Sequence, residues 1–74
     1  MNENDLRLLS ELEVSTEIKK VTLESVRGTV EKTEDGFLFL PLDTRFSSIF
    51  SQFCSTMVEM KRLLNLMAEA NKSN

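Results

Sequence analysis

Hydrophobic positions recur at alternating steps of three and four residues along the last third of the chain. This spacing aligns side chains on one face of a helix and is typical of the a/d seam of a heptad repeat. The pattern predicts a long amphipathic helix over approximately residues 44–70, with Asp43 as its N-cap. The predicted seam consists of Phe46, Phe50, Phe53, Met57, Met60, Leu64 and Met67.

A helix of this length is longer than the rest of the chain can cover. It would extend about 40 Å, whereas a compact chain of this size is about 25 Å across. Three interpretations of the seam stay open: the core of a monomer, the seam of a homodimer, and a helix that fills a groove on another protein. We favour the homodimer, because chains this small usually need a disulfide framework, a metal or an oligomer for stability.

A second, shorter helix is predicted near the N-terminus. Leucines crowd the run DLRLLSEL on overlapping helical faces, and acidic residues lie in its first turn. We expect a helix over Asp5 to Glu13 with Asn4 as its N-cap. A helix of this length is not stable alone in water, so it must pack on the rest of the chain.

The next segment is rich in β-branched residues, which favour strands. Two alternating sets, Val21 with Leu23 and Val26 with Val30, are out of phase with each other. One extra residue near Glu24 would bring them into phase, as in a β-bulge. We therefore expect a strand with a bulge or break here, in preference to a second helix capped by a residue near position 15.

The clearest turn in the chain is the segment 33–36, which ends in Asp35-Gly36. Asp-Gly between two strand-like runs predicts a tight hairpin in which glycine takes a positive φ. The run FLFLPL that follows is apolar on both faces, so we expect it to be buried on both sides or to face a partner. Phe37 and Phe39 therefore join the predicted interface, and Pro41 ends the strand or lies on an edge.

Together these elements predict one small α+β domain over residues 1–74. It would contain a short N-terminal helix, an antiparallel β-hairpin and a long C-terminal amphipathic helix through which two copies pair.

The composition argues against catalysis and against a bound cofactor or metal. The chain has no histidine and one cysteine, Cys54, so it cannot form an internal disulfide, and a zinc site of the usual ligands is not expected. Without a neighbouring histidine as base, we expect Cys54 to be a buried or interface-flanking thiol. The acidic residues are dispersed along the chain, and two glycines are too few for a phosphate-binding loop.

The formal net charge is −3, which does not favour tight binding of nucleic acid. No apolar run reaches the length of about 20 residues that a membrane span needs, and the polar, acidic start does not resemble a secretory signal. We therefore expect a cytoplasmic, non-enzymatic, protein-binding adaptor, inhibitor or regulatory subunit that acts as a small dimer on a larger protein. The alternative is a small dimeric transcriptional regulator that binds nucleic acid through the hairpin, using Lys19, Lys20, Arg27 and Lys32, although four glutamates lie among these cations.

Overall fold

A computed structural model of the protein describes residues 1–42 and 51–72. Within these residues the chain forms two helices and a four-stranded antiparallel sheet, which confirms the predicted α+β class. The predicted hairpin is thus part of a larger sheet. In chain order the elements are α1 (Glu3–Val14), β1 (Lys20–Leu23), β2 (Gly28–Lys32), β3 (Phe37–Pro41), β4 (Gln52–Cys54) and α2 (Met57–Lys72).

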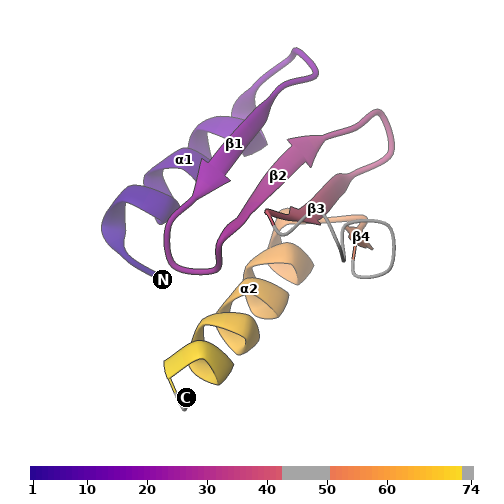
Figure 1. Ribbon diagram of the computed structural model, residues 1–74. Helices are drawn as coiled ribbons and strands as arrows, with labels where there is room; N and C mark the ends of the chain where they lie inside the picture. Colours follow the sequence, from indigo (N-terminus) through magenta and orange to yellow (C-terminus); the bar gives the residue numbers. More distant parts are fainter. Residues whose placement is uncertain (43–50, 73–74) are drawn as a thin grey trace.

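The strands follow one another in the order β1-β2-β3-β4, and both helices pack against the sheet (Figure 1). Helix α1 contacts β1 and β2, whereas α2 contacts β3 and β4. Both helices contribute to the same core as alternate residues of the strands, so they cover one face of the sheet. Among the described residues, the core side chains are Leu9, Leu12, Val21, Leu23, Val26, Val30, Phe37, Phe39, Met57, Met60 and Leu64.

Helix α1 begins two residues before its predicted start. Its N-cap is Asn2 instead of Asn4, and the Asn2 Oδ1 accepts a 2.8 Å hydrogen bond from the backbone N–H of Asp5. The Asp5 side chain is fully buried. Its two carboxylate oxygens accept hydrogen bonds from the backbone N–H groups of Glu24 (3.0 Å) and Ser25 (2.9 Å). Asp5 therefore holds the start of α1 against the turn between β1 and β2.

That turn replaces the predicted bulge. Val21 and Leu23 lie on β1, Val26 lies in the turn itself, and Val30 lies on β2 directly opposite Val21. Arg27 closes the turn with a φ of 48°, a left-handed conformation that is uncommon for residues other than glycine. Its carbonyl accepts a hydrogen bond from the N–H of Leu42, the residue that follows β3. The predicted break in the strand is confirmed, and it is a turn over residues 24–27 in which the chain reverses direction.

The hairpin between β2 and β3 is confirmed, and Pro41 ends β3 as predicted. The N–H of Thr33 donates to the carbonyl of Gly36 at 2.8 Å, and the Thr33 hydroxyl accepts from the N–H of Gly36 at 3.0 Å. The predicted reason for the glycine was wrong, because Gly36 has no positive φ. A Cβ on Gly36 would instead lie 2.5 Å from the carbonyl oxygen of Cys54, so the glycine lets β4 approach.

The long C-terminal helix is the main correction. Residues 52–54 form β4, and α2 begins at Met57, so the helix cannot run unbroken from residue 44. The predicted N-cap Asp43 lies outside the described residues. The cap is Thr56, whose Oγ1 accepts a 3.2 Å hydrogen bond from the N–H of Glu59. Threonine followed by glutamate three residues later is the sequence signature of a capping box, and this signal marks the observed start.

Because α2 is shorter than the predicted helix, its hydrophobic side can be covered within a single chain. Helix α2 has 16 residues, about 24 Å of helix, so the rest of the chain is long enough to cover it. Met57, Met60 and Leu64 are buried in the core of the single chain, and Met67 is partly buried against it. The seam residues that lie on α2 are therefore covered by the chain's own core, whereas Phe53 lies on β4.

Candidate functional site: the outer face of the sheet

The sheet face turned away from both helices is the candidate site, and we call it the outer face. Residues directly opposite in an antiparallel sheet point to the same side, so the pairing register assigns its members. One row across the four strands is Lys20, Glu31, Leu38 and Phe53, and a second row is Thr22, Thr29 and Leu40. The β1–β2 half is polar and the β3–β4 half is apolar.

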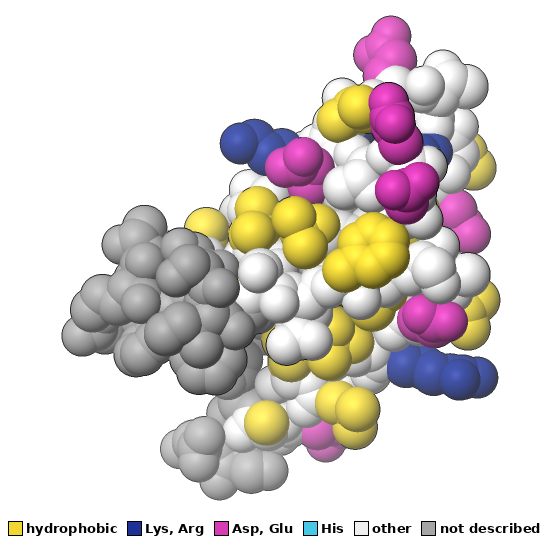
Figure 2. Space-filling view, turned by 90° about the vertical axis from the view of Figure 1, so that its right-hand side faces the viewer, with side chains coloured by type: hydrophobic (Ala, Val, Ile, Leu, Met, Phe, Trp, Pro, Cys, Tyr) yellow, Lys and Arg dark blue, Asp and Glu magenta, His cyan; other side chains and the backbone are white. Residues whose placement is uncertain are grey.

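The apolar half follows from the sequence of β3, which has large hydrophobic residues at successive positions. Phe37 and Phe39 point into the core, so Leu38 and Leu40 must point outward. Both leucines are partly buried, whereas Phe53 on β4 is 53% exposed. Figure 2 views the molecule from the β3–β4 side and shows exposed hydrophobic side chains bordered by acidic ones.

The structure separates the predicted interface residues into three groups. Phe46 and Phe50 lie outside the described residues. Phe37, Phe39, Met57, Met60, Leu64 and Met67 are buried or partly buried within the chain. Of the predicted residues that the structure describes, Phe53 is the one left exposed. Phe53 was thus predicted as an interface residue, whereas Leu38 and Leu40 were not, although the alternation of side chains along β3 places both on the outer face.

Cys54 lies on β4 and packs partly against the core. Burial, together with the nearby carboxylate of Glu59, raises the pKa of the Cys54 thiol. A raised pKa keeps the thiol protonated at neutral pH, and the protonated form is a poor nucleophile. This geometry does not favour covalent catalysis at Cys54.

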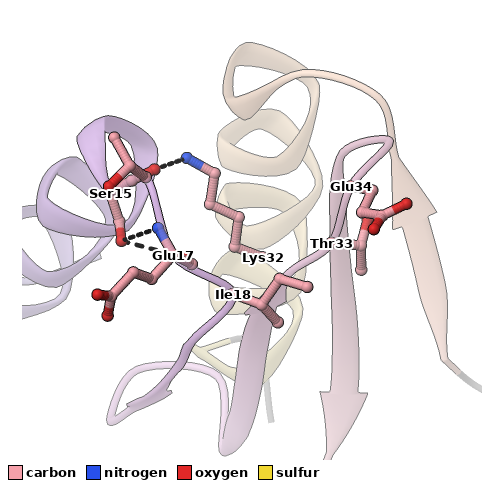
Figure 3. A pocket seen from close by; sticks show the side chains of 7 residues that line it. Ser15, Glu17, Ile18, Lys32, Thr33 and Glu34 are labelled. Carbon is pink, nitrogen blue, oxygen red and sulfur yellow. Dashed lines mark hydrogen bonds between the residues drawn. The ribbon is translucent and has the colours of Figure 1, made fainter.

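A shallow depression lies where the segment after α1 passes the end of β2. Figure 3 shows Lys32 reaching across it toward Ser15, with Ile18 and Glu34 at its sides. The Lys32 ammonium donates to the backbone carbonyls of Glu13, at 3.2 Å, and of Ser15. These carbonyls lie at the C-terminal end of α1, where a cation is stabilising. Lys32 therefore acts as a helix cap that β2 supplies, and α1 has no basic residue of its own in its last turn.

Three of the four cations proposed for nucleic-acid binding lie at one end of β1 and β2, where the carbonyl of Lys19 accepts a 2.8 Å hydrogen bond from the N–H of Lys32. Lys32 is engaged at the end of α1, and Arg27 lies in the turn at the other end of β2. Lys20 is on the outer face, directly opposite Glu31. Because the Lys32 ammonium is engaged and Arg27 lies apart, the charge left for phosphate binding on these residues would come mainly from Lys19 and Lys20, and tight phosphate binding requires clustered cations.

Across residues 1–42 and 51–72, no three Cys, Asp or Glu side chains form a group able to hold a metal ion. Over the same ranges no helix combines the length and the hydropathy that crossing a membrane requires. A comparison with models of known protein families, with curated proteins and with solved structures gives no match for this chain.

Proposed function

We propose that this chain is a non-enzymatic, cytoplasmic protein-binding protein: an adaptor, inhibitor or regulatory subunit that acts as a small dimer and occupies a surface of a larger protein. The observation that carries this proposal is the apolar half of the outer face, formed by Leu38, Leu40 and Phe53. Neither helix packs on that side of the sheet.

Association through such a surface is consistent with its composition. Protein interfaces are enriched in aromatic residues at their centre and are depleted there in charged residues. The outer face has this arrangement, because Phe53 and the two leucines are adjacent while Lys20 and Glu31 lie toward β1. Its polar half would form the rim of the interface.

The proposal is tested by affinity capture with the wild-type chain and with Leu38→Lys as bait, in the cell of origin. A stoichiometric partner protein that the wild type retains and the folded Leu38→Lys variant loses would support protein binding through this face. Thr22→Lys is the matched control, because it adds the same charge to the polar half. Equal capture by all three baits would overturn the assignment of this face.

A further inference from the structure

We propose that two copies of this chain pair through the edge of β4 that has no strand partner within residues 1–42 and 51–72, so that their two four-stranded sheets join into one continuous antiparallel sheet. This inference rests on the proposed function, because it names the surface through which the proposed dimer forms. The β4 edge replaces the helix seam as the proposed dimer surface. Of the described seam residues, those on α2 are buried or partly buried, and Phe53 belongs to β4.

The two edges of the sheet differ in how they are protected. An unprotected edge strand offers unpaired backbone groups to any other strand, and proteins usually block it with charges, proline or a covering helix. A helix packs on one face of each edge strand, α1 on β1 and α2 on β4, so the helices do not distinguish the two edges. The β1 edge follows Lys19 and begins with Lys20, which place charge on it. Strand β4 has the sequence Gln-Phe-Cys, without charge or proline, and within the described residues it pairs only with β3. Among the described residues, β4 is therefore the edge strand without a charged side chain or a proline.

The alternation of side chains limits the register of such a pairing. Opposite residues must lie on the same face, so a shift by one residue is excluded. The antiparallel register that pairs all three residues of β4 places Phe53 opposite Phe53 of the second copy, and Gln52 opposite its Cys54. This register is its own two-fold image, which a symmetric dimer requires.

In this register the outer faces of the two copies form one apolar row. Leu38 and Phe53 are cross-strand neighbours in each copy, so the row runs Leu38–Phe53–Phe53–Leu38 across the joined sheet. Each Phe53 ring, now 53% exposed, gains an aromatic neighbour. Because β4 is uncharged, two copies bring no like charges together along the strand. Self-complementarity in charge, register and hydrophobicity favours a second copy over an unrelated strand.

The proposed pairing involves only the three residues of β4 in each copy, so we expect the dimer to be weak. Three residues span about 10 Å of strand, so the interface falls below the ~1,600 Å² of a standard complex. We therefore expect a dimer that dissociates in the micromolar range, with the mass rising as the concentration rises.

Gln52→Cys tests the register directly, since it places a new thiol opposite Cys54 of the second copy. Gln52 is exposed, so we expect the variant to fold, which circular dichroism will check. Under mild oxidation the paired thiols should form a covalent dimer at least about tenfold faster than thiols that meet by random collision. Two controls measure the random rate: Thr22→Cys on the opposite edge strand, and Gln52→Cys combined with Cys54→Ser.

The outcomes separate this inference from the proposed function. Fast cross-linking that needs both thiols, together with a dimeric mass of the unmodified chain, supports pairing through β4. A dimeric mass with cross-linking no faster than the controls overturns β4 pairing and leaves the proposed dimer standing. A monomeric mass at every concentration overturns both the pairing and the dimer. If the chain is a monomer but still captures a partner protein through Leu38, the pairing of two copies is overturned. Binding of another protein through the outer face then still stands.

Discussion

The carboxylate of Asp5 accepts a 2.9 Å hydrogen bond from the backbone N–H of Ser25, twenty positions further along the chain. Its other oxygen accepts from the N–H of Glu24. The side chains around this contact reinforce it, since Asn2 and Asn4 both donate to the Glu24 carboxylate at 3.3 Å. A fully buried aspartate thus joins the first turn of α1 to the turn between β1 and β2.

Asp5→Ala should lower the free energy of unfolding by about 1–3 kcal/mol, because it leaves two backbone N–H groups without their acceptor. Asp5→Asn should cost less, since its amide oxygen still accepts one of the two bonds. Urea denaturation at pH 7 measures both variants. Glu11→Ala, an exposed acidic position of α1, is the control and should change little. Equal stability of Asp5→Ala and the control would contradict the role of Asp5.

The same carboxylate should make stability depend on acid pH. Burial acts to raise the pKa of Asp5, but the hydrogen bonds from Glu24 and Ser25 outweigh it, and the pKa is lowered from the ordinary value of 3.8. The stabilisation is therefore complete above 3.8, and it is lost as the pH falls through the lower pKa of the folded state. Denaturation curves from pH 6 downward should show a steeper loss for the wild type than for Asp5→Asn. Parallel curves would show that Asp5 does not contribute.

Gly28→Ala should destabilise the core by about 1–3 kcal/mol. A Cβ at this position would lie 2.2 Å from Cε1 of Phe39, whose ring is buried against the glycine. Combining the change with Phe39→Leu makes room, so the double variant should lose less than the sum of the two single losses. A double-mutant cycle from thermal or urea unfolding measures this coupling. Additive losses would mean that the ring does not pack on Gly28.

Lys32→Met should lower stability by about 1 kcal/mol, because it removes a charged donor from the C-terminal carbonyls of α1 while retaining an apolar stem of similar length. Lys20→Met is the matched control on the same sheet, and we expect almost no effect from it because Lys20 is exposed. Amide hydrogen exchange of the last turn of α1 adds a local measurement. Faster exchange there in Lys32→Met alone would confirm the cap, and unchanged exchange would contradict it.

Phe53 and Met60 should respond oppositely to a charge, although both belong to the predicted seam. Phe53→Lys should remain folded and lose self-association, because Phe53 is exposed on an edge strand. Met60→Lys should unfold the chain, because Met60 is fully buried in the core. Far-ultraviolet circular dichroism and light scattering distinguish the two outcomes. A folded Met60→Lys variant would contradict the position of α2 on the sheet.

Much of the first half of the fold is predictable from short-range chemistry. The leucine-rich run gives α1, and the Asp35-Gly36 turn between two apolar runs gives the β2–β3 hairpin. The β1–β2 turn is harder to predict, because Arg27 adopts a left-handed φ without the glycine or asparagine that usually signals it.

The C-terminal third shows why periodicity alone misleads. Phe53 and Met57 are four residues apart, so they match a helix, yet one lies on β4 and the other begins α2. Between them, Ser55 and Thr56 break the helix, and the Thr56 cap specifies where α2 starts. The outer face follows from the alternation of β3 once the sheet is known. Which side the helices cover depends on tertiary packing, which no local pattern records.

Pairing of two chains through β4 is tested by sedimentation equilibrium of the wild-type chain and of Phe53→Lys over a range of concentrations. We predict that the wild-type mass rises from one chain toward two as the concentration increases, and that the folded Phe53→Lys variant stays at one chain throughout. A wild-type chain that keeps the mass of a single copy at every concentration would contradict pairing through β4. A Phe53→Lys variant that associates as tightly as the wild type would contradict it as well.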